Sequence, residues 1–182
     1  MARRLPCKSL SDRDVIVAVP GDDQVPALIA LINALAAERS QLFIQPVDPV
    51  GGLAAVRTHL AAMARGHEMV LVARHDEALV GLITGSRGSH PARRGVVDIG
   101  IGVRADRRGR GVGFALMSAL EDHALRAGCH RLQLHVATTN AAAIALYRKI
   151  GFVVEGELRG TAIIDGRRVD EFAMAKLLTP KS

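Results

Sequence analysis

The stretch VVDIGIGVRADRRGRGVG, residues 96–113, contains the features that decide the expected fold. Its first eight residues are mostly β-branched or small and predict a buried strand, and its end is rich in glycine and arginine. An amphipathic helix is expected to follow over residues 114–127, with Leu116, Leu120 and Ala124 on one stripe. A strand that continues through a glycine-rich connection into a helix indicates an α/β protein.

The glycine-rich connection resembles an anion-binding turn. Alternating glycines at Gly109, Gly111 and Gly113 let backbone N–H groups turn toward one point, where the helix dipole adds positive potential. This geometry suits a phosphate or pyrophosphate; an ordinary tight turn packed on its helix is the alternative. Neither a P-loop nor a dinucleotide-binding motif fits, because GK[ST] is missing and the next strand ends HVA, residues 135–137, without an acid.

The strand before the turn has one almost bare face, formed by Asp98, Gly100 and Gly102. Glycine inside a strand marks a bulge or the close approach of another backbone or a ligand. If this strand and a parallel neighbour splay at a bulge, an extended ligand with amides can pair along its edge. A ligand that carries amides at one end and a pyrophosphate at the other is coenzyme A.

Periodicity and turn signals predict the other elements. Strands are expected over residues 15–19, 69–73, 79–84, 96–103, 132–136, 152–154 and 169–177, and helices over 24–39, 46–65, 114–127 and 140–150. The crossover through the helix at 114–127 implies a parallel pair of strands, and the flanking hairpins imply a mixed sheet with helices on both faces. Residues 1–14 are expected to be a frayed segment before a single domain over 15–182.

Composition limits the class of protein. With 182 residues, 49% hydrophobic and 23% charged, the chain suits one globular domain and not a disordered one. No uncharged apolar run approaches the ~18 residues that cross a bilayer, and the basic start lacks an apolar segment behind it, so neither membrane insertion nor secretion is expected. The isolated Cys7 and Cys129 are expected to be free thiols in a reducing cytoplasm.

The net charge of +6 alone is compatible with nucleic acid, a membrane surface or an acidic small molecule as partner. An aromatic content of 3%, with one Tyr and no Trp, argues against single-stranded nucleic acid. Residues 104–110 hold four Arg and one Asp, a net charge of +3, so half of the excess lies around the proposed phosphate turn. The scattered histidines form no metal-ligand motif, and no metal is expected.

Two motifs together resemble the GNAT superfamily of acetyl-CoA-dependent N-acetyltransferases. The first is R-x-x-G-x-G over residues 108–113, and the second is N-x-x-A-x-x-x-Y-x-x-x-G-F over residues 140–152. The resemblance covers about residues 15–178. It implies a fold of six to seven mostly antiparallel strands, with a splayed parallel pair at strands four and five and helices on both faces.

The resemblance also implies how acetyl-CoA binds. The backbones of Ile101 to Val103 would pair with pantetheine, the N–H groups of Arg108 to Gly113 would hold the pyrophosphate, and Asn140 and Ala143 would flank the arm. The implied cofactor residues are Ile101, Gly102, Val103, Arg108, Gly109, Arg110, Gly111, Val112, Gly113, Asn140, Ala143 and Tyr147. Asn140 also suits a helix N-cap, which does not exclude the cofactor role.

Three residues are catalytic candidates. Tyr147, the single tyrosine, falls where the family places the hydroxyl that protonates the leaving thiolate; a ring packed in the core is the alternative. His135 stands where ribosomal-protein acetyltransferases of the superfamily place a base Glu, and a solvated strand histidine is the alternative. Asp98 is the rival base, and a structural hydrogen-bonding role is equally compatible with its position.

The tail over residues 151–175 most resembles members that acetylate L-amino acids or small amines. Glu38 ends the first predicted helix, where its carboxylate could meet an ammonium; an exposed helix-end Glu is the alternative. The expected reaction is direct attack of a small-molecule amine on acetyl-CoA in a ternary complex, in the cytoplasm and without nucleic acid or membrane. Alternatives are protein N-terminal or lysine acetylation, a non-catalytic acetyl-CoA-binding module, and nucleic-acid binding by the arginine cluster. Pairing of edge strands into a homodimer is compatible with the fold.

Overall fold

A computed structural model describes residues 15–38, 46–48, 52, 54, 56–58, 68–164 and 166–179 of the chain. The predicted frayed segment 1–14 lies outside the described residues, and so does most of the predicted helix over 46–65. Residues 52, 54 and 56–58 are helical as predicted, but residues 46–48 are not, so the helix does not begin at Pro46 as the sequence suggested. Cys129 is a buried free thiol, and Cys7 belongs to the segment that is not described.

A seven-stranded mixed sheet in the order β1-β2-β3-β4-β5-β7-β6 forms the centre of the molecule. Its strands are β1 (Val15–Ala18), β2 (Glu68–His75), β3 (Ala78–Arg87), β4 (Val96–Val103), β5 (Arg131–Ala137), β6 (Val153–Ile164) and β7 (Arg167–Leu177). Every neighbouring pair is antiparallel except β4 and β5, which are parallel. The predicted mixed sheet with its parallel pair at strands four and five is confirmed.

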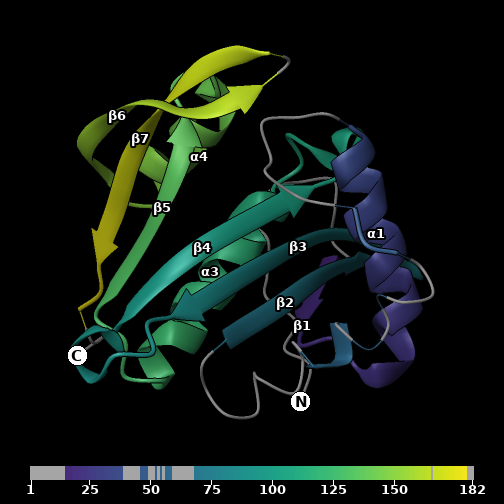
Figure 1. The fold of residues 1–182 in the computed structure, drawn as a ribbon. Coiled ribbons are helices and arrows are strands. Elements are labelled where there is room, and N and C mark those ends of the chain that lie inside the picture. Colours follow the sequence, from purple (N-terminus) through teal and green to yellow (C-terminus); the bar gives the residue numbers. More distant parts are fainter. Residues whose placement is uncertain are drawn as a thin grey trace.

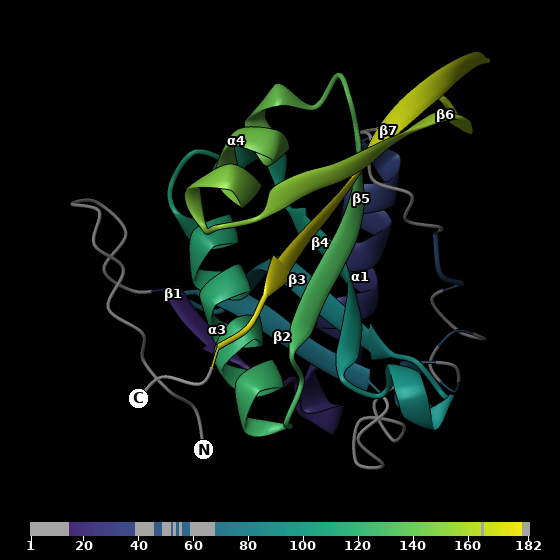
Figure 2. The same cartoon turned by 90° about the vertical axis from the view of Figure 1, so that its left-hand side faces the viewer.

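Helices cover both faces of the sheet, as predicted. Figure 2 shows α3 (Val112–Arg126) and α4 (Ala141–Lys149) on one side and α1 (Val25–Ala37) on the other. Each side has its own apolar core, the larger one beneath α3 and α4 and the smaller one beneath α1. Within the described ranges, no helix is long and apolar enough to cross a bilayer.

Helix α1 packs on the sheet through an apolar stripe that includes Leu28, Leu31 and Leu35. These side chains recur at helical spacing and meet Val70 and Val72 of β2 together with β3. The helix ends at Ala37, so Glu38 projects from its C-terminus toward the neighbouring loop. The register of the stripe therefore fixes where that carboxylate lies.

Two of the boundaries that differ from the sequence predictions have clear physical reasons. Helix α3 begins at Val112, two residues before the predicted start, because Gly111 takes a left-handed conformation with φ of 87° and serves as the N-cap. Strand β6 extends to Ile164, far beyond the predicted end at residue 154. It is the edge strand of the sheet, and its side chains are largely exposed, so its sequence lacks apolar alternation.

Glycines in β3 let α3 approach the sheet closely. A Cβ built on Gly85 would lie 2.8 Å from Val97 Cγ1 and 3.2 Å from Leu120 Cδ1. A Cβ on Gly81 would lie 3.0 Å from Leu116 Cδ1 and 3.2 Å from the Gly102 carbonyl oxygen. This close packing sets the N-terminal end of α3 directly beside β4.

Replacing Gly85 by Ala tests this packing. The added methyl group would overlap Val97, which is fully buried and stiff at χ1, so we expect a loss of about 1–3 kcal/mol in unfolding free energy. Urea unfolding followed by circular dichroism measures it. The matched control is Gly156→Ala, whose Cβ meets nothing within 4 Å and which should not destabilise the protein. Equal stability of Gly85→Ala and wild type would show that α3 and the sheet can move apart to admit the methyl group without a loss of free energy.

Candidate active site

The parallel pair β4–β5 is short. Only Val96–Arg131, Val97–Leu132 and Asp98–Gln133 are in register, after which the two strands diverge, as Figure 1 shows. The predicted splay is therefore confirmed. The splay does not come from a bulge, which the sequence had left as one possibility, because β4 pairs with β3 in even register from Val97 to Val103. The opening instead arises because β5 follows β7 along its whole length, while β4 follows β3.

A cavity of about 550 Å³ occupies this opening. Its lining comes from both faces of the sheet, since Ile99, Ile101, Leu134, Val136 and Tyr147 belong to or pack on the α3–α4 core. The α1 side contributes Ile32, Leu82, Thr84, Asp98, Gly100, Gly102, His135 and Glu171, and Asn140 completes the lining. The cavity therefore passes between the separated strands and connects the two sides of the sheet.

The glycine-rich turn has the free amides that an anion site requires. After the 3₁₀ turn η3 (Ala105–Arg107), Gly109 and Gly111 take left-handed conformations with φ of 72° and 87°. None of the N–H groups of residues 109–113 donates a hydrogen bond to another described residue. They precede or begin the fifteen-residue helix α3, so its dipole adds positive potential at the same place.

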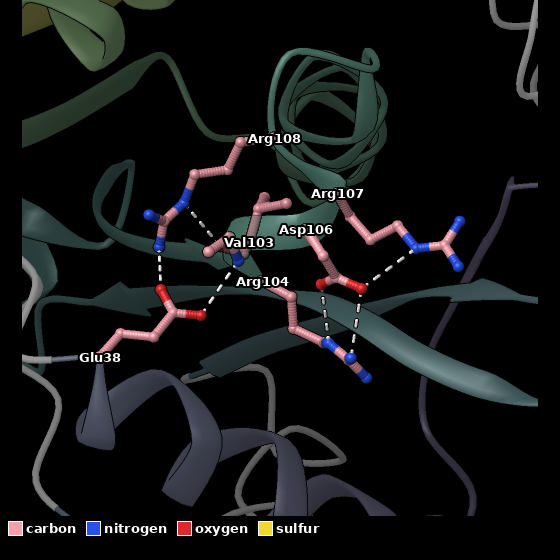
Figure 3. A network of polar contacts seen from close by, with 7 residues as sticks. Glu38, Val103, Arg104, Asp106, Arg107 and Arg108 are labelled. Atoms are coloured by element: carbon pink, nitrogen blue, oxygen red, sulfur yellow. Dashed lines mark hydrogen bonds and ion pairs between the residues drawn. The ribbon is translucent and has the colours of Figure 1, made fainter.

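Arg108 differs from the other residues of the turn. Its backbone N–H donates to the Ala105 carbonyl at 3.3 Å, so that amide is not available to a pyrophosphate, contrary to the expectation for this residue. Its side chain folds back, with Nε donating to the Val103 carbonyl at 2.9 Å and Nη2 paired with Glu38 (Figure 3). Arg108 therefore braces the turn against the end of β4.

Glu38 is held by this brace. One carboxylate oxygen accepts from the Ala105 N–H at 3.0 Å and the other meets Arg108 (Figure 3). Glu38 does not line the cavity, although the sequence suggested that it would meet an acceptor ammonium. Its position instead joins the end of α1 to the glycine-rich turn.

The arginine cluster is less positive than its composition suggests. Asp106 pairs with Arg104 at 3.1 Å and with Arg107 at 3.6 Å, as Figure 3 shows, and Arg108 pairs with Glu38. Arg110 is exposed and forms no ion pair with any described residue. Of these four arginines, Arg110 is therefore the one whose charge is not paired with a described carboxylate.

The candidates at α4 have the structural roles that the sequence left open, and both also line the cavity. Asn140 caps the helix, its Oδ1 accepting from the Ala143 N–H at 3.2 Å, and it also lines the cavity. The Tyr147 ring is 7% exposed and packs against Phe152 with ring centroids 5.9 Å apart. It lines the cavity too, and its hydroxyl makes no hydrogen bond with the described residues. Burial raises the pKa of Tyr147 to about 12, so the hydroxyl keeps its proton at neutral pH.

Both predicted base candidates line the cavity from the α1 side. His135 is exposed and has no hydrogen-bonding partner among the described residues. Asp98 is exposed as well, but its Oδ1 accepts from Gln133 Nε2 at 2.6 Å across the last register pair of β4 and β5. Asp98 therefore has the structural hydrogen bond that the sequence left open, and it stabilises the point where the strands separate.

Glu171 of β7 is a cavity residue that the sequence analysis missed. It is 6% exposed and lines the cavity with His135 and Tyr147. The sequence did carry one signal of it. Glu171 shares one face of its predicted strand with Ala173 and Ala175, so an acidic residue stands among small apolar ones. Within the described part of the chain, no group of three or more His, Cys, Asp or Glu residues could hold a metal ion.

Comparison with known proteins shows the family. Residues 33–152 match the model of the acetyltransferase (GNAT) family. The L-methionine sulfoximine/L-methionine sulfone acetyltransferase of Pseudomonas paraeruginosa is 31% identical over 94% of this chain and 96% of its own length. The L-amino acid N-acetyltransferase AaaT of Escherichia coli is 38% identical over 59% of this chain and 67% of its own length.

Solved structures agree. The ribosomal-protein-alanine N-acetyltransferase from Brucella melitensis has a TM-score of 0.79 and 27% identity, covering 89% of this chain and 99% of that one. The chain belongs to the GNAT family, and it is an acetyl-CoA-dependent N-acetyltransferase.

The site described above fits acetyl-CoA. The β5-facing edge of β4 beyond Asp98 is unpaired, and this suits a ligand with amides. The free N–H groups of residues 109–113 suit a pyrophosphate. Tyr147 lines the same cavity as Gly100, Ile101 and Gly102 of that edge.

The raised pKa of Tyr147 can be measured directly, because the chain has one Tyr and no Trp. We expect tyrosinate absorbance to appear with a midpoint of about 12 in the folded protein and ~10 in denaturant. The stability that comes from keeping the hydroxyl neutral is complete below pH ~10 and is lost as pH rises toward about 12. Tyr147→Phe should lose less stability across that window. A midpoint near 10 in protein still folded by circular dichroism would contradict the burial.

The brace at Arg108 is tested by Glu38→Gln, which removes the ion pair with the guanidinium. Because half-exposed ion pairs contribute about 0.2–1 kcal/mol, we expect roughly a threefold weaker affinity for acetyl-CoA by calorimetric titration. The matched control is Glu77→Gln, which breaks an exposed pair with Arg74 in the turn between β2 and β3 and should change nothing. An unchanged affinity in Glu38→Gln would mean that the turn holds its shape without the brace.

Proposed function

We propose that this enzyme acetylates the α-amino group of a small amino acid or a closely related amine. The observation that carries the proposal is the chemistry of the cavity. Its α1 side presents the carboxylates of Asp98 and Glu171 beside His135, and no Lys or Arg is among the described lining residues. Such a surface favours an ammonium group. Similarity to the L-methionine sulfoximine/sulfone and L-amino acid acetyltransferases supports the same acceptor class.

Acetyl-CoA, when bound, supplies the acetyl group as a thioester. We propose that the edge of β4 from Ile101 to Val103 holds its pantetheine arm, with Asn140 and Ala143 beside it. The N–H groups of residues 109–113 and the free charge of Arg110 would hold the pyrophosphate. An N–H of the unpaired β4 edge is available to a carbonyl oxygen that develops negative charge.

The proton transfers are assigned to residues on opposite faces. An α-amino group with a pKa of ~7.7–8.0 must lose a proton before it can attack. His135 is exposed at the cavity and an imidazole can both accept and release a proton, so we assign it the route by which that proton reaches solvent. Tyr147 lies on the other face with its proton retained, and its hydroxyl would donate to the sulfur leaving group.

Acetylation of a protein N-terminus is the second candidate, and the structural similarity to a ribosomal-protein-alanine acetyltransferase favours it. The two acceptors differ in size. A screen that follows CoA release with amino acids, polyamines, aminoglycosides and short peptides distinguishes them. Turnover of peptides alone would overturn the proposed amino-acid acceptor.

We place the enzyme in the cytoplasm, with residues 15–182 forming one domain and neither nucleic acid nor membrane as partner. A homodimer through sheet edges is compatible with the exposed edge strand β6, whose Ile163 is 72% exposed.

Tyr147→Phe tests the proposed acid. Removal of the hydroxyl should lower kcat by about 10²-fold or more, since general acid catalysis typically contributes that much. The ring and its contact with Phe152 remain, so acetyl-CoA affinity and thermal stability near neutral pH should be kept. Steady-state kinetics and calorimetric binding separate the two effects. Full activity of this variant would exclude Tyr147 as the acid, and an inactive wild type that binds acetyl-CoA would favour a non-catalytic module.

A further inference from the structure

Glu171 is the one buried charged residue in the part of the chain that the structure describes. It lies in β7 opposite Ala137 of β5 and Leu158 of β6, and it lines the cavity. A buried carboxylate is costly unless hydrogen bonds or an opposite charge compensate it. Its partners therefore indicate what the site is built to receive.

The hydrogen bonds that Glu171 accepts inside the protein are too few to compensate the burial of its carboxylate. Its Oε2 accepts from the Thr161 hydroxyl at 2.7 Å. Its Oε1 accepts no hydrogen bond from any described residue, and no described Lys, Arg or His forms an ion pair with the carboxylate. One oxygen and the negative charge are thus left for a cationic donor in the cavity.

A bulge in β6 positions this carboxylate. The register of β6 and β7 shifts between Leu158 and Ala162, and Gly160 takes a left-handed conformation with φ of 62°. The Gly160 N–H donates to Asp170 Oδ1 at 2.7 Å, which fixes the bulge next to Thr161 and its bond to Glu171. Bulges commonly re-aim side chains beside active sites.

The sheet register also brings Glu171 to the acceptor side of the cavity. Glu171 pairs with Ala137 and Ala173 pairs with His135, so the carboxylate and the imidazole are diagonal neighbours on one face. Tyr147 belongs to the core on the opposite face. A group held at Glu171 therefore meets the opening from the side away from Tyr147.

We propose that Glu171 binds the ammonium group of the acceptor and takes the proton that activates it. This inference rests on the proposed amine acetylation and identifies the residue that receives the amine. One N–H bond of the ammonium breaks with its electron pair remaining on nitrogen, and an O–H bond forms at Glu171 Oε1. The proton then leaves to solvent on the side of the exposed His135.

Glu171→Gln tests the proposal, because it keeps the shape of the side chain and removes its charge. With L-methionine sulfone as acceptor, we expect kcat/KM to fall by roughly 10²-fold near neutral pH and the affinity for acetyl-CoA to stay unchanged. Glu157→Gln, on an exposed position of the same hairpin, is the matched control and should retain full activity. Thermal unfolding verifies that both variants fold.

The pH profile separates catalysis from a merely structural role. The titratable groups that share the cavity with Glu171 are His135, Asp98 and Tyr147. They are unchanged between the wild type and Glu171→Gln. Without the carboxylate the enzyme depends on amine that is already neutral, so the defect should shrink as pH rises past the amine pKa of ~7.7–8.0. A structural defect would instead lower kcat/KM by one factor at every pH.

A second variant keeps the test decisive if Glu171→Gln fails to fold. Thr161→Val removes only the hydroxyl that orients the carboxylate, and we expect a smaller fall of roughly threefold to tenfold in kcat/KM. Its defect should come from a higher KM for the amine at unchanged acetyl-CoA affinity. Wild-type kinetics in this variant would overturn the role of the Thr161–Glu171 pair.

The outcomes for Glu171 and for the acceptor are distinguishable. Equal kcat/KM of wild type and Glu171→Gln at neutral pH would overturn the role of Glu171 and leave acetyl transfer intact. A wild type that acetylates peptides but not L-methionine sulfone would overturn the proposed amino-acid acceptor. The kcat/KM values of wild type and Glu171→Gln with the peptide would then test the role of Glu171. If no amine is acetylated, calorimetry can still compare how tightly L-methionine sulfone binds to the CoA-loaded wild type and to CoA-loaded Glu171→Gln. Equal affinities of the two proteins would overturn the proposal.

Discussion

The parallel pairing of β4 with β5 stops at Asp98 and Gln133, and the active site exists because it stops there. Each strand keeps an antiparallel neighbour along its other edge, β3 for β4 and β7 for β5, so the sheet remains continuous while an opening forms within it. Backbone groups along such an opening need partners from water or a ligand. The amide-rich arm of acetyl-CoA would supply them if it binds as proposed, so the gap would cost stability in the free enzyme and contribute affinity for the cofactor.

The opening also divides the chemistry between the two faces of the sheet. Tyr147 and the start of α3 lie on one side, while His135 and Glu171 lie on the other. A group that must keep its proton is buried in an apolar core, where burial disfavours the charged form. The groups that would receive a proton lie on the opposite face, where Thr161 and solvent can support charge. The sheet thus separates the proposed acid from the proposed base within one small cavity.

The sequence predicted those parts of the site whose residues lie close together along the chain. The turn at residues 109–113 and the helix that carries Tyr147 follow from local motifs, and Val96–Val103 has the predicted bounds. The pairing of Arg108 with Glu38 could not be predicted because the two residues are seventy positions apart in the sequence. Glu171 was missed because its burial depends on strand order and on a bulge in an edge strand, neither of which apolar alternation encodes.

The contact between Glu38 and Arg108 has a consequence for how the two substrates affect each other. Helix α1 contributes Ile32 to the proposed acceptor side of the cavity, and its end is tied through Glu38 to the turn proposed to hold the pyrophosphate. Any displacement of α1 by an acceptor therefore acts on the turn through this tie. Thermodynamic linkage requires the reverse effect to have the same free energy, so a cofactor that orders the turn also biases the acceptor side. If both substrates bind as proposed, a single carboxylate thus links the two parts of the site.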